Sequence, residues 1–199
     1  MRHILTSRRV LVWALIAVIL IGLVAVWQIQ RIYLREFDPD GRLVSFMPDE
    51  IRLPASSFIQ ILDLSCPCNG FSREHIASLV KNANQQGLVN SQIWVLNNGH
   101  LQPERLKAIA QANHLEESAV RVIEAEDYPW IPATPAALIS NSDGTVAYFG
   151  PFSSGIRCNT GNSFIDSVIQ RIETGNHVFP QVNAIVDGCF CPWPGKILN

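Results

Sequence analysis

The sequence predicts one N-terminal membrane-spanning helix followed by a single α/β domain built on a central mixed sheet. Two observations lead to this fold class. Residues 10–27 form an unbroken run of 18 residues without a charged side chain. After about residue 55, apolar segments of strand length alternate with amphipathic segments of helix length. Such alternation is typical of an α/β sheet whose first strands are parallel.

The apolar run is long enough to cross a bilayer. As a helix it would extend roughly 27 Å, close to the hydrocarbon thickness. Trp13 and Trp27 lie towards its two ends, where amphipathic rings favour the membrane interface. A cleaved signal peptide is the alternative, but residues 26–30 contain no small-residue cleavage pattern. We therefore expect residues 10–27 to be an uncleaved transmembrane helix.

The charges around this helix predict its orientation. Arg2, Arg8, Arg9 and the terminal amine precede the apolar run, whereas Arg31 and Arg35 follow it. The positive-inside rule then places residues 1–9 in the cytoplasm. We expect a single-pass protein of a bacterial inner membrane with its soluble domain in the periplasm, a compartment that permits disulfides.

The rest of the 199-residue chain divides into a connector and one domain. Residues 28–54 are polar with several turn signals and are expected to form an extended or short helical stalk. Residues 55–199 are expected to form the domain, with a cysteine-containing extension from about residue 176. The expected strands are residues 57–65, 92–96, 121–125, 136–140 and 145–149, with a possible extra strand at 182–186, and the expected helices are residues 71–86, 103–115 and 163–173.

Charge and cysteine content limit the function. The net charge is −2 and the soluble part has no cluster of Lys and Arg, so a nucleic-acid partner is not expected. Four of the five cysteines form two C-x-C pairs, Cys66 with Cys68 and Cys189 with Cys191, and Cys158 is the fifth. In a domain of this size such pairs indicate redox or metal chemistry rather than a small disulfide scaffold.

The first pair lies between a predicted strand and a predicted helix. Free N–H groups and the positive end of a helix dipole stabilise a thiolate at that place, and the thiolate is the reactive species. Pro67 lacks an N–H group and fixes its own backbone, so the loop between Cys66 and Cys68 should be stiff. These two thiols are the predicted catalytic residues, with inert or statically paired thiols as the alternative.

Three features together resemble the thioredoxin-like superfamily over roughly residues 55–175. They are the strand–cysteine–helix segment LDLSCPCNGFSREHIASL, the dipeptide Thr134-Pro135 before the strand 136–140, and the hairpin NSDGTV followed by Gly150 and a closing helix. The resemblance implies a three-layer fold in which Pro135 is a cis-proline facing the active cysteines. It also points to a family of membrane-anchored thioredoxin-like proteins of Gram-negative bacteria, which implies a fold and a location.

The chain departs from that superfamily in its cysteine spacing. The usual motif has two residues between the cysteines, whereas this chain has one. Either Cys68 attacks and Cys66 resolves the mixed disulfide from upstream, or Cys66 attacks and Cys68 resolves it. Asp63, in an otherwise apolar strand, is a candidate buried acid that accepts a proton from the resolving thiol, and a solvent-facing residue is the alternative.

The second pair, within the segment Cys189-Phe190-Cys191-Pro192-Trp193-Pro194, lies outside the superfamily core. It is either a second dithiol that exchanges with the first, or a structural disulfide that pins the tail. A third possibility is a site for copper or zinc built from Cys66, Cys68, Cys189 and Cys191, since thiolates bind both metals.

These observations favour a membrane-anchored extracytoplasmic thiol-disulfide oxidoreductase without a cofactor. Its expected partners are extracytoplasmic proteins that carry thiols or disulfides, with electrons from a membrane redox partner or a small thiol pool. One alternative is a copper or zinc chaperone on a thioredoxin-like fold. The other is a non-catalytic thioredoxin-like binding module with structural disulfides.

Overall fold

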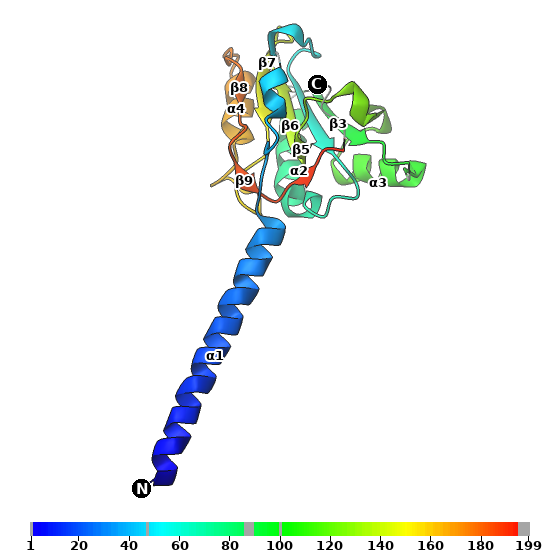
Figure 1. Ribbon diagram of the computed structural model, residues 1–199. Coiled ribbons are helices and arrows are strands. Elements are labelled where there is room, and N and C mark those ends of the chain that lie inside the picture. Colours follow the sequence, from blue (N-terminus) through cyan, green and yellow to red (C-terminus); the bar gives the residue numbers. More distant parts are fainter. Residues whose placement is uncertain (1, 47, 86–89, 100, 195–199) are drawn as a thin grey trace.

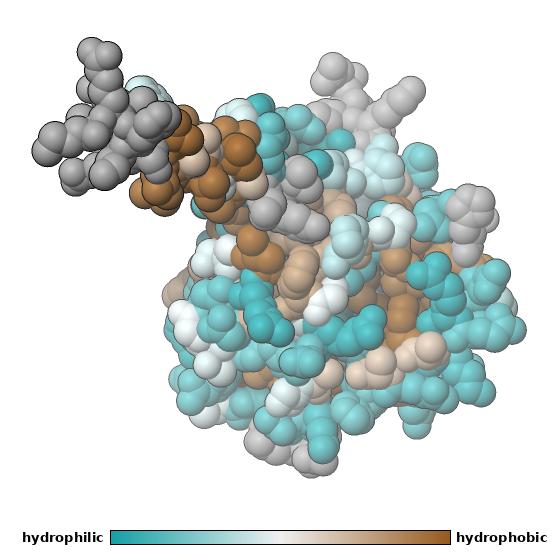
Figure 2. All heavy atoms as spheres, turned by 90° about the horizontal axis from the view of Figure 1, so that it is seen from below, coloured by the Kyte–Doolittle hydropathy of each residue, from teal (hydrophilic) through white to brown (hydrophobic). Residues whose placement is uncertain are grey.

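The computed structural model describes residues 2–46, 48–85, 90–99 and 101–194. Its first element is the helix α1 (Arg2–Tyr33), which projects from the folded domain (Figure 1). The window Val10–Gln28 is long and apolar enough to cross a membrane, and none of it is buried. Figure 2 shows its hydrophobic side chains emerging from a mostly hydrophilic domain surface. One N-terminal apolar helix of this kind is either a single membrane span or a signal sequence.

The domain is built on a six-stranded mixed sheet. The strand order is β4-β3-β2-β6-β7-β8. Parallel pairs join β2 to β3, β3 to β4 and β7 to β8, whereas β6 is antiparallel to both β2 and β7. The strands are β2 (Ser57–Leu62), β3 (Asn90–Leu96), β4 (Val120–Ile123), β6 (Ala136–Ser140), β7 (Val146–Gly150) and β8 (Gln181–Val182). The predicted α/β class with a central mixed sheet is confirmed.

Three helices cover one face of this sheet. They are α2 (Asn69–Gln85), α3 (Pro103–Ala112) and α4 (Ile165–Glu173). Alternate residues of the strands point to this face because side chains alternate along a strand. Phe58 and Leu62 of β2 therefore pack in one core with Ile76 of α2 and Ile169 of α4.

The opposite face is covered without an α-helix. Ile59 and Ile61 of β2 pack there against the connector after α1, the loop 125–134 and the C-terminal tail. The short elements of this layer are the 3-10 helices Arg42–Ser45, Pro48–Glu50 and Ala125–Asp127, and the strand pairs β1 (Arg35–Glu36) with β9 (Asp187–Gly188) and β5 (Ala133–Thr134) with β10 (Cys191–Pro192). A further 3-10 helix, Glu117–Ala119, precedes β4.

The connector is part of the domain rather than a free stalk. Phe37 is fully buried and contacts Phe149 and Phe190, and Phe46 is 5% exposed. Asp38 fixes the following turn by accepting hydrogen bonds from the backbone N–H groups of Arg42 and Leu43. The stalk expected from the polar composition of residues 28–54 therefore differs from the structure, because a few aromatic residues within it complete the second core.

Several element ends differ from the sequence prediction. The first strand of the sheet stops at Leu62 instead of Ser65, because Asp63 begins a turn. Helix α3 ends at Ala112, since His114 adopts a left-handed conformation with φ of 56°. The hairpin turn is as predicted, with Gly144 at φ 79° and the Thr145 N–H group bonded to Asp143. Residues 86 and 195–199, part of the predicted helix and tail, lie outside the described residues.

Candidate functional site

The four paired cysteines form two disulfides between the two C-x-C segments. Cys66 is bonded to Cys191 with a Cα–Cα distance of 5.9 Å, and Cys68 is bonded to Cys189 with a Cα–Cα distance of 5.4 Å. The pairing is antiparallel, first cysteine with last. Neither C-x-C segment closes on itself, so the dithiol within residues 66–68 that the sequence suggested is not the disulfide of this state. The tail is instead fastened to the loop between β2 and α2.

This loop is held by a network of local hydrogen bonds. The backbone N–H of Cys66 and the side-chain amide of Asn69 both donate to the carbonyl oxygen of Asp63, at 2.9 and 2.6 Å. The backbone N–H groups of residues 69–71 each donate to the carbonyl oxygen three positions earlier, and α2 begins at Asn69. Cys66 and Cys68 therefore lie at the positive end of the dipole of α2, where a released thiolate is stabilised.

The tail lies along the backbone that leads to Pro135. The Thr134–Pro135 peptide bond is cis, as predicted. The two-residue strand β10 is antiparallel to β5, with Cys191 opposite Thr134 and Pro192 opposite Ala133. The Sγ atom of Cys66 lies 3.7 Å from the carbonyl oxygen of Thr134. An extended chain segment with a cysteine is thus held beside Pro135 and bonded to Cys66.

Contacts on both sides of the cysteines hold the tail in place. Trp193 is 2% exposed, and its indole N–H donates to the carbonyl oxygen of Ala125 at 3.1 Å. On the other side, the N–H of Cys189 donates to the carbonyl oxygen of Gly155 at 3.2 Å. Gly188 permits this close approach, because a Cβ there would lie 2.7 Å from the same carbonyl oxygen. The tail is therefore fixed by packing as well as by disulfides.

The two disulfides differ in burial. Cys66, Cys68 and Cys189 are 5–6% exposed, whereas Cys191 is partly exposed. Thiol-disulfide exchange needs a thiolate to reach one sulfur from outside. The Cys66–Cys191 disulfide is therefore the more open to exchange of the two.

Asp63 lies in the turn just before Cys66, and its carboxylate is hydrogen-bonded to Ser65. The residue is half-buried, and its carboxylate accepts hydrogen bonds from the backbone N–H and the hydroxyl of Ser65, at 2.9 and 2.8 Å. The structure gives Asp63 a place in the turn before Cys66. Its predicted role as a proton acceptor stays a prediction.

The sulfur atoms are close enough to be candidate metal ligands once reduced. The Sγ atoms of Cys66, Cys68 and Cys191 all lie within 4.8 Å of one another. In the disulfide state these sulfurs carry no thiolate, and thiolate is the form that binds zinc or copper(I). A metal at this place therefore requires reduction of the disulfides first.

The fifth cysteine is a free, buried thiol next to the second disulfide. Cys158 lines a small cavity of about 20 Å³ together with Cys68, Cys189 and Pro135. Burial raises the pKa of the Cys158 thiol, an effect only partly opposed by a hydrogen bond to Ser153. The thiol is therefore a weak nucleophile in the folded protein.

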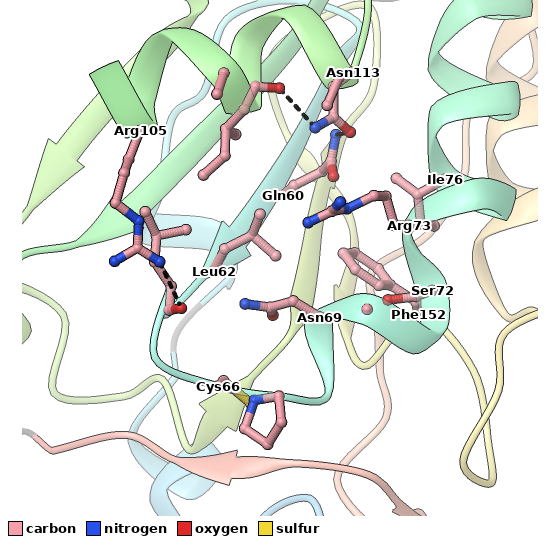
Figure 3. A pocket seen from close by; sticks show the side chains of 16 residues that line it. Gln60, Leu62, Cys66, Asn69, Ser72, Arg73, Ile76, Arg105, Asn113 and Phe152 are labelled. Atoms are coloured by element: carbon pink, nitrogen blue, oxygen red, sulfur yellow. Dashed lines mark hydrogen bonds between the residues drawn. The ribbon is translucent and has the colours of Figure 1, made fainter. Parts of the chain in front are cut away.

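A larger cavity lies on the helix side of Cys66 (Figure 3). It has a volume of about 450 Å³ and lies between β2, α2 and α3. Arg73 of α2 and Arg105 of α3 flank it, and Gln60 and Asn69 also line it. These residues form no motif in the sequence, because no local pattern relates positions on a strand and two separate helices.

Comparison with known proteins agrees with the fold and leaves the activity open. A family model described as "Domain of unknown function (DUF6436)" matches residues 44–193. No curated protein matches the sequence. Among solved structures, a conserved protein of Geobacillus kaustophilus is 14% identical with a TM-score of 0.50, and the match covers 75% of this chain and 82% of that one.

Two further similar structures are of proteins whose names refer to thioredoxin or to disulfide oxidoreduction. A thioredoxin-like protein in its oxidised form is 12% identical with a TM-score of 0.45, over 67% of this chain and 87% of that one. A secreted disulfide oxidoreductase of Mycobacterium tuberculosis is 14% identical with a TM-score of 0.38, over 68% of this chain and 99% of that one. The central mixed sheet, the antiparallel hairpin of β6 and β7 and the cis-proline before β6 agree with the predicted thioredoxin-like fold, whereas the second face of the sheet is covered by loops and the tail.

Proposed function

The chain belongs to the DUF6436 family of domains of unknown function, and we propose that it is an extracytoplasmic thiol-disulfide oxidoreductase whose exchanging disulfide is Cys66–Cys191. In this proposal Cys66 is the nucleophile and Cys191, in the tail, is the resolving cysteine. The observation that carries it is the geometry of the tail. Strand β10 pairs with β5 beside Pro135 while its cysteine is bonded to Cys66.

The tail geometry supports this proposal because it is the geometry that a polypeptide substrate needs. A substrate segment in extended conformation would pair with the free edge of β5 by main-chain hydrogen bonds, once β10 has left it. Its cysteine would then lie where Cys191 lies now, next to the Sγ atom of Cys66. The tail thus acts as an internal substitute for the substrate.

The exchange balances without a cofactor. A substrate thiolate attacks the Sγ atom of Cys66, a substrate–Cys66 disulfide forms, and Cys191 leaves as a thiolate. A second substrate thiolate attacks the substrate sulfur of that mixed disulfide and releases the Cys66 thiolate at the start of α2. The substrate loses two electrons and becomes a disulfide, and the protein gains them as two thiols. In the opposite direction, the Cys66 thiolate attacks a substrate disulfide and Cys191 resolves the product.

In this proposal the second disulfide has a supporting role. Cys68 and Cys189 are both buried, and their disulfide keeps residue 189 at the loop before α2 while Cys66 and Cys191 are reduced and β10 has left β5. The tail can then return and re-form its disulfide with Cys66 as an intramolecular reaction, which a high effective concentration favours.

The proposed location is the periplasmic side of a bacterial inner membrane, with α1 as an uncleaved anchor and residues 1–9 in the cytoplasm. Two disulfides suit an oxidising compartment. Only about 9 Å of helix separate Gln28 from Leu34, and Arg35 pairs with Gly188, next to Cys189. The cysteines would therefore face the membrane surface, where a membrane redox partner can reach them. An intact N-terminal peptide in membrane-extracted protein would support the anchor, and a mature chain beginning after residue 27 would refute it.

The proposed function is tested on the full chain in detergent micelles, equilibrated over a series of redox potentials. Thiol trapping and mass spectrometry report the state of each cysteine. We expect Cys66–Cys191 to open reversibly between about −270 and −120 mV, the range of known exchange proteins, with Cys68–Cys189 still closed. A matched variant, C68A/C189A, should keep the exchanging disulfide, whereas C66A/C191A should lose it.

Two results would refute this function. One is a Cys66–Cys191 disulfide that resists reduction until below about −300 mV, as structural disulfides do. The other is stoichiometric zinc or copper in the reduced protein, which would favour the metal-binding alternative supported by the sulfur cluster.

A further inference from the structure

The cavity between β2, α2 and α3 has the chemistry of a site for a small anion. Its walls carry the guanidinium groups of Arg73 and Arg105, and no Asp or Glu lines it. Both arginines are exposed at its rim, and Figure 3 shows the Arg73 side chain extending towards Gln60. Among the described residues neither arginine has an ion-pair partner. Guanidinium groups bind carboxylates by strong, charge-assisted hydrogen bonds.

The interior of the cavity also offers unused hydrogen-bonding groups. The side-chain amide of Asn69 donates to Asp63, but its Oδ1 atom is buried and has no partner. Arg105 donates one long hydrogen bond of 3.4 Å to the carbonyl oxygen of Leu64. Gln60, 2% exposed, adds a second buried amide, which is joined to Asn113 by a long contact of 3.5 Å. A ligand with carboxylates and N–H groups would match the arginines and amides that line the cavity.

One end of the cavity is formed by Cys66 and Pro67. The tail that carries Cys191 lies on the far side of Cys66 from the cavity (Figure 3). A thiolate in the cavity would therefore reach Cys66 from the side away from the tail. Attack on the Sγ atom of Cys66 would then release the Cys191 thiolate on the tail side.

We propose that this cavity binds a small thiol compound with carboxylate groups, such as a cysteine-containing peptide, and directs its sulfur to Cys66. This inference rests on the proposed function, because it supplies the small-thiol side of the same exchange. The bound thiolate attacks the Sγ atom of Cys66, forms a mixed disulfide there and releases the Cys191 thiolate. A second molecule of the thiol then attacks its sulfur in that mixed disulfide, which yields the oxidised small thiol and the Cys66 thiolate.

The two partners thus reach Cys66 from different directions. A polypeptide approaches from β5 and the tail, whereas the small thiol approaches from the helix side through the cavity. In that arrangement the protein passes electrons between a small thiol pool and protein cysteines without the two partners competing for one surface.

Binding is tested first with S-methylglutathione, which has the carboxylates but cannot exchange. Calorimetry on the full chain in detergent micelles should show binding to the wild type. Arg73→Glu and Arg105→Glu should each weaken it by about tenfold or more, since each replaces a charge-assisted contact by repulsion. Arg171→Glu, an exposed residue of α4 outside the cavity, changes the net charge equally and should leave binding unchanged.

Kinetics test the direction of attack. The same two variants should slow reduction of Cys66–Cys191 by glutathione about tenfold or more, and should slow reduction by dithiothreitol, which has no carboxylate, much less. In the Cys191→Ala variant, oxidised glutathione should form a mixed disulfide at Cys66, and Arg73→Glu should slow its formation equally.

The possible failures are distinguishable. If S-methylglutathione does not bind, or if Arg171→Glu weakens binding as much as the cavity variants, the site does not exist as proposed. If inorganic phosphate competes with S-methylglutathione at an equal concentration, the cavity is a general anion site and the thiol assignment is wrong. If S-methylglutathione binds as expected but no thiol opens Cys66–Cys191, the binding site is real and the proposed function has failed.

Discussion

Replacing the two cysteines of a disulfide by alanine should lower the free energy of unfolding by an amount that depends on whether the other disulfide is still present. Each disulfide joins residues more than 120 positions apart in the chain, with separations of 125 and 121. Once one of them is formed, however, the other closes only a ring of six residues, residues 66–68 and 189–191. The chain-entropy model gives about 5 kcal/mol for the long loop and about 2 kcal/mol for the six-residue ring at 25 °C.

The two disulfides are therefore strongly non-additive. We expect C66A/C191A and C68A/C189A each to lower the free energy of unfolding by about 2 kcal/mol, and the four-alanine variant to lower it by about 7 kcal/mol. Pairing within each C-x-C segment would close only three-residue loops. Each double variant would then break both disulfides, so the two double variants and the four-alanine variant would all lose about 3 kcal/mol.

The measurement is urea unfolding of the full chain in detergent micelles, followed by tryptophan fluorescence. A whole domain is stable by only about 5–15 kcal/mol, so all variants are measured in the same concentration of sucrose, which stabilises the folded state. Equal losses of about 3 kcal/mol in both double variants and in the four-alanine variant would refute the pairing of Cys66 with Cys191 and Cys68 with Cys189. Equal losses of about 5 kcal/mol in one double variant and in the four-alanine variant would mean that a single long-range disulfide is present.

Two further predictions concern buried groups near the site. Because burial raises the pKa of the Cys158 thiol, iodoacetamide at pH 8 should alkylate it roughly tenfold or more slowly in the folded protein than in urea; equal rates would contradict its burial. Burial also raises the pKa of Tyr148, whose hydroxyl donates to the Pro151 carbonyl oxygen at 2.6 Å. Since the folded-state pKa is the higher one, its contribution to stability is complete below the unfolded pKa of about 10 and is lost as the pH rises further. Tyr148→Phe should cost about 1–2 kcal/mol at pH 7 and flatten the loss of thermal stability between pH 9 and 11; an unchanged pH profile would show that the tyrosine does not cause it.

Features that depend on residues close together in the sequence could be predicted from it. The apolar run 10–27 is visible as composition, and the order of strands and helices is visible as periodicity, because side chains alternate along strands and repeat every 3.6 residues on helices. The Asp143-Gly144 turn and the position of Cys66 between a strand and a helix are likewise local. The place of Pro135 was inferred from a resemblance, and the cis bond at that residue agrees with it.

Features that depend on distant residues were decided only by the tertiary structure. No residue near Cys66 or Cys191 in the sequence determines that they pair over 125 positions. The equal spacing of the two C-x-C segments is compatible with antiparallel pairing, but it does not select it. The burial of Phe37 depends on a sheet face that no α-helix covers in the described part of the chain. The cavity beside Cys66 exists because α2 and α3 pack on the same face of the sheet and bring Arg73 and Arg105 to its rim. Local pattern therefore determines which elements form, whereas packing decides which side chains meet and so where chemistry can take place.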